Sequence, residues 1–190
     1  MPIKKCLIFS GPSGSGKSTL IKFVLRTFRS ACATVSCTTR LRRDSEVDGL
    51  DYHFISHSEF DELVASGEFL EHTECYGNRY GTLRSAVYDV LADHDLCIID
   101  LDYNGAHRVL AHNIIPEYEC VGILVLPPSL GALESRLHFR NSETPESIKR
   151  RIDESFNVPK IAGYQHVIIN DDADAAFGDI TSIITSIMQQ

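Results

Sequence analysis

The stretch Gly11–Ser18 constrains the fold of this chain more than any other part of its sequence. It reads GPSGSGKS, follows the short apolar run Cys6–Ser10 and precedes Ser18–Phe28, whose apolar residues recur at helical spacing. The pattern GxxxxGK[ST] between a strand and a helix is typical of a phosphate-binding loop. Its glycines let successive backbone N–H groups point inward, and the N-terminus of the helix attracts anions. The alternative is a Gly/Ser-rich turn that binds nothing, but the complete motif in this context favours the phosphate site.

Two residues at the end of this loop are expected to act on a bound nucleotide. The ammonium group of Lys17 should contact the β- and γ-phosphates of ATP, and the hydroxyl group of Ser18 should bind the Mg²⁺ that accompanies the nucleotide. The predicted ATP-binding loop consists of Gly11, Pro12, Ser13, Gly14, Ser15, Gly16, Lys17, Ser18 and Thr19.

Apolar runs of strand length alternate with segments of helical spacing along most of the chain. Buried strands are predicted at Cys6–Ser10, Ala33–Ser36, Leu96–Asp100, Cys120–Leu126 and His166–Asn170. Helices are predicted at Ser18–Phe28, Leu83–Ala92, Gly105–His112, Leu130–Phe139, Glu146–Phe156 and Ala173–Met188. This alternation predicts an α/β fold of the P-loop NTPase type, in which helices cover a doubly wound parallel sheet.

Two segments interrupt the alternation within the single domain predicted for residues 1–190. Residues 38–84 are polar and rich in turns, and they predict a small inserted lobe with a helix at Glu59–Ala65 and short strands at Tyr52–Ile55 and Phe69–His72. Residues 136–151 concentrate positive charge in a chain of net charge -8, which predicts a helical lid that meets an anion. The core then comprises residues 1–37, 85–135 and 152–190.

Composition argues against several classes of partner. The net charge of -8 and the pI of about 5.4 disfavour nucleic acid, whose phosphates attract a surplus of Lys and Arg. The six cysteines form no CxxC pair, so neither a zinc site nor a disulfide framework is indicated. No apolar stretch approaches the roughly 20 residues that span a bilayer, and Gly11 and Pro12 end the N-terminal apolar run too early for a signal peptide. We expect a cytoplasmic monomer or homodimer with small-molecule substrates and no membrane or nucleic-acid partner.

A second cluster of polar groups lies across the start of the inserted lobe. The run Val35–Arg43 holds three arginines together with Ser and Thr hydroxyl groups, and the paired donors of a guanidinium group suit phosphate oxygens. A fixed cation near a transferring phosphoryl group also stabilises its charge. The run therefore predicts a second phosphate site, with a solvated basic turn as the alternative.

Taken together, the motifs of this chain resemble those of the guanylate kinase family. The matching motifs are GPSGSGKST, VSCTTRLRRDSEVDGLDYHF, GEFLEH, GNRYGT, IIDLDYNGA, the PPS within Leu126–Ser129, and VIINDD, in family order from about residue 6 to residue 172. Several are weak singly, but the set is specific. Three positions depart from the family pattern: Arg79 stands where an aromatic residue is common, Cys37 where His or Ser is common, and Phe139 where a glycine often precedes the lid arginine.

The resemblance implies a GMP site in the inserted lobe. The residues implied for the phosphate group are Arg40, Arg43, Tyr52 and Tyr80, and those for the guanine ring are Ser36, Glu71, Thr82 and Asp102. Chemistry supports the two carboxylates independently, because guanine presents N1–H and N2–H₂ as donors and an ionised carboxylate only accepts. Without the resemblance, Glu71 could equally be a solvated surface residue and Asp102 a helix cap.

The resemblance also implies an ATP site that spans the core and the lid. Arg136, Arg140 and Arg151 match the arginines that close over the ATP phosphates, with an exposed basic helix as the alternative. Asn170 and Asp171 match positions near the adenine ring. Asp100, at the end of a predicted central strand, is a candidate for indirect contact with Mg²⁺ or for capping the next helix.

The implied activity is Mg²⁺-dependent transfer of the γ-phosphoryl group of ATP to GMP, and to dGMP, in purine nucleotide metabolism. No general base is needed, because the phosphate oxygens of GMP are already nucleophilic. The residues implied to stabilise the transferring charge are Lys17, Arg40, Arg43, Arg136, Arg140 and Arg151. Two alternatives stay open: a non-catalytic guanylate-kinase-like binding module, which would lack Lys17 or the lid arginines, and a related kinase of ribose bisphosphate, which would not need Glu71 and Asp102.

Overall fold

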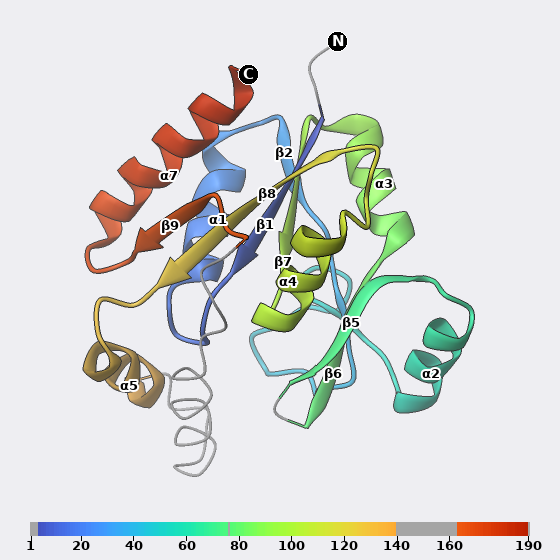
Figure 1. Ribbon diagram of the computed structural model, residues 1–190. Helices are drawn as coiled ribbons and strands as arrows, with labels where there is room; N and C mark the ends of the chain where they lie inside the picture. Colours follow the sequence, from blue (N-terminus) through green and yellow to red (C-terminus); the bar gives the residue numbers. More distant parts are fainter. Residues whose placement is uncertain (1–3, 76, 140–162, 190) are drawn as a thin grey trace.

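The computed structural model describes residues 4–75, 77–139 and 163–189, and a parallel sheet forms the centre of the molecule (Figure 1). The strands lie in the order β2-β7-β1-β8-β9, and each neighbouring pair is parallel. Their bounds are β1 (Lys5–Ser10), β2 (Ala31–Ala33), β7 (Leu96–Asp100), β8 (Glu119–Leu126) and β9 (His166–Ile169). Because the strands are parallel, their carboxyl ends meet at one edge of the sheet, where open α/β sheets bind ligands.

Helices cover both faces of this sheet, as the sequence predicts. Leu7 and Phe9 of β1 belong to an apolar cluster with α1 (Lys17–Thr27) and α7 (Ala173–Met188). The alternate residues of β1, Cys6 and Ile8, pack with α3 (Arg84–Asp93) and α4 (Tyr103–His112) on the other face. Figure 1 shows the two pairs of helices on opposite sides of the strands. Burial on both faces explains why these strands appear in the sequence as continuous apolar runs.

The inserted lobe is built on a second, four-stranded sheet between β2 and α3. Its strand order is β4-β3-β6-β5, and α2 (His57–Ala65) packs against it. The strands are β3 (Cys37–Thr38), β4 (His53–Phe54), β5 (Phe69–Cys75) and β6 (Asn78–Leu83). Ser56 and Glu59 form a capping box that starts α2. The ring of Phe60 lies 4.5 Å from that of Phe69, so a small apolar cluster of its own holds the helix on the lobe sheet.

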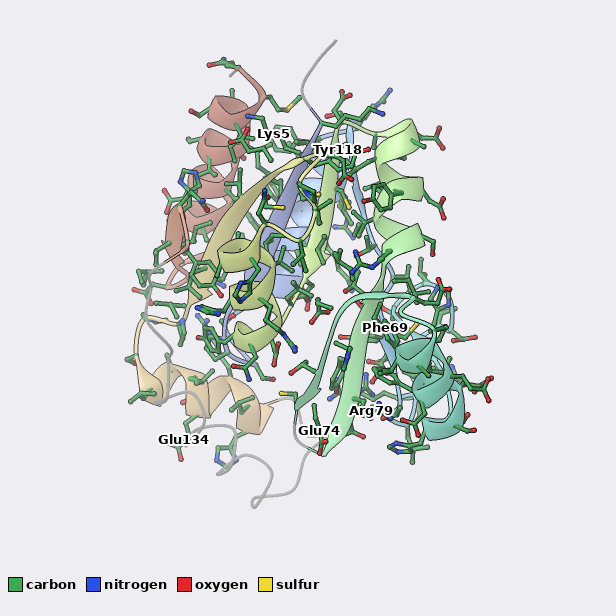
Figure 2. The ribbon with its side chains drawn as sticks, turned by 45° about the vertical axis from the view of Figure 1, so that its right-hand side comes forward. Lys5, Phe69, Glu74, Arg79, Tyr118 and Glu134 are labelled. Carbon is green, nitrogen blue, oxygen red and sulfur yellow. The ribbon has the colours of Figure 1, made fainter. Side chains whose placement is uncertain are left out.

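Helix α5 (Leu130–Phe139) follows β8, and its last turn is the start of the segment 136–151 predicted as a lid. Figure 2 shows α5, labelled at Glu134, at the same end of the molecule as the β5–β6 hairpin, labelled at Glu74. The remainder of the predicted lid lies outside the described residues, and with it Arg140, Arg151 and the helix predicted at Glu146–Phe156.

Several details of the fold differ from the sequence prediction. The strand predicted at Ala33–Ser36 is wrong in position: β2 ends at Ala33, and the chain then leaves the sheet to enter β3 of the lobe. The helix predicted from Gly105 begins two residues earlier, because Asp102 caps it. Strands β3 and β6 were not predicted at all. Helix α2 begins at His57 and not at Glu59, and β5 continues to Cys75 beyond the predicted end at His72. Of the helices in the described ranges, none has the length and apolar character needed to cross a membrane.

Candidate active site

The phosphate-binding loop connects the carboxyl end of β1 to the start of α1. Gly11, Gly14 and Gly16 have φ values of 145°, 91° and 96°, which side chains rarely tolerate. A Cβ atom at Gly11 would also lie 2.0 Å from the carbonyl oxygen of Val125 on β8. Glycine is therefore required here by both backbone conformation and packing. The first turn of α1 contains no acidic residue, which suits a helix end that meets anions.

Lys17 lies between this loop and the end of β7. Its Nζ atom donates a hydrogen bond to the carbonyl oxygen of Gly11 at 2.9 Å and lies 3.8 Å from Oδ1 of Asp100. Desolvation by surrounding protein raises the pKa of Asp100, and the ammonium group of Lys17 opposes that rise. Ser18 and Thr19 follow as exposed residues in the first turn of α1. Of the two residues predicted to associate with Mg²⁺, Ser18 directly follows Lys17 in the chain, and Asp100 lies close to Lys17 in space.

The end of β9 closes the other side of the loop. The Nδ2 atom of Asn170 donates a hydrogen bond to the carbonyl oxygen of Ser15 at 2.7 Å, and Nη2 of Arg136 donates to the carbonyl oxygen of Asn170 at 2.8 Å. A hollow of about 430 Å³ lies here, lined by Gly14, Gly16, Thr19, Leu20, Arg136, Asn170, Asp171, Ala173 and Phe177. The structure therefore brings Arg136, Asn170 and Asp171 to the phosphate-binding loop.

In the lobe, Arg40 and Arg43 share one carboxylate, that of Glu46. Nη2 of Arg40 donates to Oε1 of Glu46 at 2.7 Å, and the backbone N–H of Arg43 donates to Oε2 at 2.9 Å. Although partial burial acts in the opposite direction, these donors lower the pKa of Glu46. The guanidinium carbon of Arg40 also lies 5.5 Å from the ring centroid of Tyr52, which meets the ring of Tyr80 edge to face at 6.0 Å. The four residues predicted to hold a phosphate group therefore form one cluster.

Glu71 is a buried carboxyl group on β5. Its side chain is only 3% exposed, and its Oε2 atom has no hydrogen-bond partner within the described part of the chain. Burial raises the pKa of Glu71 to about 7; repulsion from Asp102 adds to the rise, whereas Arg108 and Thr82 oppose it. A buried acceptor without a partner lowers stability, and groups with a strongly shifted pKa cluster at functional sites.

Asp102 and Thr82 flank Glu71. Oδ1 of Asp102 accepts a hydrogen bond from the backbone N–H of Gly105 at 2.7 Å, and its Oδ2 accepts one from the hydroxyl group of Thr73 at 3.2 Å. Asp102, and not Asp100, is therefore the residue that caps α4. The hydroxyl oxygens of Thr82 and Ser36 are 3.2 Å apart. The residues predicted to contact a guanine ring thus lie next to one another.

Comparison with known proteins decides the family. The guanylate kinase family profile matches residues 3–187, nearly the whole chain. This chain belongs to the guanylate kinase family. Among its relatives are the guanylate kinases of Thiobacillus denitrificans, 41% identical over 182 residues that cover 95% of this chain and 85% of the relative, and of Alkalilimnicola ehrlichii, 39% identical over 180 residues that cover 94% and 87%.

A solved member of the guanylate kinase family has the same fold. The crystal structure of guanylate kinase from Anaplasma phagocytophilum superposes with a TM-score of 0.73 at 26% sequence identity, and the match covers 100% of this chain and 89% of that one. The predicted α/β fold class and the resemblance to the family are both confirmed.

Three residues that contact the predicted site residues of this guanylate kinase family member escaped the sequence analysis. Glu46 had a detectable signal, because it is an acid three residues after Arg43, the last residue of the run of arginines. Thr73 and Arg108 had none, because their partners lie far away in the sequence. Thr73 and Asp102 are 29 positions apart, and Glu71 and Arg108 are 37 positions apart.

Proposed function

We propose that this protein transfers the γ-phosphoryl group of ATP to GMP, giving ADP and GDP, with Mg²⁺ bound to the ATP. The observation that carries the proposal is the proximity of two anion sites at the carboxyl edge of the sheet. Asp100 links them: it lies 3.8 Å from Lys17 of the phosphate-binding loop, and its charge adds to the rise that burial causes in the pKa of Tyr52 in the lobe. Two phosphorylated ligands bound at these sites would therefore meet near the end of β7.

The donor site would bind the triphosphate of ATP through the loop and its neighbours. The backbone N–H groups of the loop after Pro12 and the ammonium group of Lys17 would supply positive charge to the β- and γ-phosphates. Arg136 already lies beside the hollow that Asn170 and Asp171 line. Arg140 and Arg151, which lie outside the described residues, complete the proposed set of arginines at the ATP phosphates.

The residues at the loop fit the Mg²⁺ that accompanies ATP. The hydroxyl group of Ser18 and the carboxylate of Asp100 are hard oxygen ligands of the kind Mg²⁺ binds. The described residues contain no group of three His, Cys, Asp or Glu side chains able to hold a metal by themselves, so phosphate oxygens and water would provide most ligands. When bound, Mg²⁺ would neutralise charge on the β- and γ-phosphate oxygens.

The acceptor site would hold the phosphate of GMP with Arg40 and Arg43 and read its base with Glu71. One phosphate oxygen of GMP attacks the γ-phosphorus in line, and the bond from that phosphorus to the β–γ bridging oxygen breaks, so that ADP leaves with the electron pair.

The buried Oε2 of Glu71 is a free acceptor for a donor on the guanine edge. Adenine lacks N1–H and N2–H₂ and would leave this carboxylate unpaired.

The test is an acceptor screen with matched variants. ADP release is measured with Mg·ATP and each of GMP, dGMP, AMP, CMP, UMP and ribose bisphosphate. We expect turnover with GMP and dGMP only, lost in Lys17→Ala and kept in Lys22→Ala, which removes an exposed charge from the same helix. Turnover with no acceptor would reject the proposal in favour of a binding module, and turnover with ribose bisphosphate would reassign the acceptor site.

A further inference from the structure

We propose that Arg108 is a positioning residue for guanine recognition, which keeps the carboxylate of Glu71 charged and aimed at the base. The inference deepens the proposed function and rests on it. It assigns a task to a residue on α4, a helix of the core, although the carboxylate that it acts on belongs to β5 of the lobe.

The geometry of Arg108 is the first step. Its Nη2 atom lies 4.0 Å from Oε2 of Glu71, and the same nitrogen donates a hydrogen bond to the carbonyl oxygen of His72, the next residue on β5. The guanidinium group is therefore fixed by the backbone of the strand that carries Glu71. A distance of 4.0 Å is too long for a hydrogen bond, so Arg108 supplies charge while it leaves Oε2 free to accept from a ligand.

The different exposure of the two side chains makes this arrangement effective. The side chain of Arg108 is 46% exposed, whereas that of Glu71 is 3% exposed. Arg108 also lines an open hollow of about 580 Å³ with His72 and His107, so water solvates its outer side. The cation therefore keeps part of its hydration, while its field still reaches a carboxylate that water does not reach.

The charges around Glu71 show why a nearby cation matters. Asp102, which precedes α4, repels the ionised form of Glu71, and burial disfavours it further. Thr82 of β6 and Arg108 of α4 are the groups that favour ionisation, and the balance leaves the pKa of Glu71 at about 7. Loss of the Arg108 charge would shift this balance toward the protonated carboxyl group at neutral pH.

The protonation state of Glu71 decides how well it matches guanine. An ionised carboxylate offers two acceptor oxygens to N1–H and N2–H₂, whereas a protonated carboxyl group presents one oxygen as a donor to a base edge that also donates. Binding of GMP should therefore weaken as Glu71 takes up its proton. The step from binding to product does not involve this group, so the effect should fall on KM and spare kcat.

The experiment follows KM and kcat for GMP from pH 6 to pH 9 in Arg108→Gln, Arg108→Lys and Arg26→Gln. Arg26 is an exposed arginine on α1 and serves as the charge-matched control. The phosphate of GMP titrates in the same way whichever variant is assayed. The KM of a variant divided by the KM of the unmodified protein at the same pH therefore reports the titration of a group on the enzyme. Thermal unfolding of each variant reports whether it is folded.

We expect Arg108→Gln to raise KM for GMP about fivefold at pH 7, because a tenfold gain in the proton affinity of Glu71 leaves about one molecule in ten ionised there. The difference should shrink toward pH 9, with kcat changed by less than about twofold. Arg108→Lys should restore most of the affinity, and Arg26→Gln should change nothing. In a Glu71→Gln background, which cannot titrate, Arg108→Gln should add no further rise.

Each contrary outcome has a distinct meaning. An unchanged KM in Arg108→Gln, or a rise that is equal at every pH and persists in the Glu71→Gln background, would overturn the role of Arg108 while the proposed function stands. Failure of the unmodified protein to phosphorylate GMP would overturn the proposed function itself, and this inference with it.

Discussion

The Nδ2 atom of Asn170 donates a hydrogen bond to the carbonyl oxygen of Ser15 at 2.7 Å, and this contact ties the end of β9 to the phosphate-binding loop. The fit is close, because a Cβ atom at Gly16 would lie 2.0 Å from the same nitrogen. Asn170 resembles a family position near adenine, and that role stays a proposal. Its amide group also holds the backbone of the loop at Ser15, so we expect the loop to keep its shape before a nucleotide binds.

Replacing Asn170 should therefore weaken ATP binding before it affects GMP. Asn170→Ala removes one neutral hydrogen bond, which contributes about 1 kcal/mol, and we expect KM for ATP to rise about fivefold. Asn170→Asp should be worse, because its carboxylate would face the carbonyl oxygen of Ser15 and repel the phosphates of ATP. Steady-state kinetics with each substrate varied in turn checks this. Equal KM values for ATP in Asn170→Asp and the unmodified protein would contradict the bracing role.

The buried carboxyl group of Glu71 should make the protein less stable as pH rises. The pKa of Glu71 is raised from 4.5 to about 7 in the folded protein. Below pH 4.5 the carboxyl group of Glu71 is protonated in both the folded and the unfolded protein. Between pH 4.5 and about pH 7 the unfolded chain loses this proton whereas the folded protein keeps it. The free energy of unfolding therefore falls across this pH range and is constant above it. At 1.4 kcal/mol per tenfold change, the loss is about 3 kcal/mol.

Glu71→Gln should remove this loss, because an amide does not titrate in that range. We expect the variant to gain about 1–3 kcal/mol relative to the unmodified protein at pH 8 and much less at pH 5, measured by urea unfolding at both values. Glu68→Gln, at an exposed position just before β5, is the control and should show no pH-dependent gain. A gain of equal size at both pH values would show that Glu71 is ionised in the folded protein throughout.

Arg79 should stabilise the lobe through its contact with an aromatic ring. Its guanidinium carbon lies 4.2 Å from the ring centroid of Phe60, and it also pairs with Asp61, whose side chain is largely exposed. Figure 2 shows Arg79 and Phe69 on the side of the lobe that α2 covers. Because exposed ion pairs contribute little, the ring contact should dominate, at about 1 kcal/mol.

This assignment explains how Arg79 replaces the aromatic residue common in the family. We expect Arg79→Ala to lower the free energy of unfolding by about 1 kcal/mol and to speed amide hydrogen exchange in α2. Arg79→Tyr should keep the exchange slow, since a second ring can pack on Phe60. Arg84→Ala, at an exposed position that starts α3, is the matched control. Fast exchange in Arg79→Tyr as well as in Arg79→Ala would assign the stability to the Asp61 pair instead.

The parts of this molecule that could be predicted from sequence are those whose cause is local. The loop Gly11–Ser18 is contiguous, and β7 has the predicted bounds Leu96–Asp100 because a strand buried on both faces is a continuous apolar run. Helices α5 and α7 also have their predicted bounds, Leu130–Phe139 and Ala173–Met188. Here periodicity and the flanking residues are sufficient.

The contacts that shape the site could not be predicted, because they join residues far apart in the chain. Asn170 and Ser15 are separated by 155 positions, and the strand β6 exists because of its pairing with β5 and β3. The resemblance to a family supplied roles for Glu71 and Asp102, but not the burial of Glu71 or the arginine beside it. The domain bounds and the roles of the individual site residues stay predictions.

Gly105 should be required for guanine recognition because of the space that it leaves for Glu71. A Cβ atom at Gly105 would lie 2.5 Å from Oε2 of Glu71, although the backbone of Gly105 is helical and would otherwise accept alanine. In Gly105→Ala the carboxylate must therefore move, and a displacement of this kind should raise KM for GMP about tenfold or more while KM for ATP stays the same.

Gly178→Ala is the matched control, since Gly178 lies in α7 with open space around its Cβ position. That variant should gain about 0.5–1 kcal/mol of stability from helix propensity with unchanged kinetics. Steady-state kinetics and thermal unfolding of both variants distinguish the two effects, and a normal KM for GMP in Gly105→Ala would show that Glu71 does not contact the base from its present position.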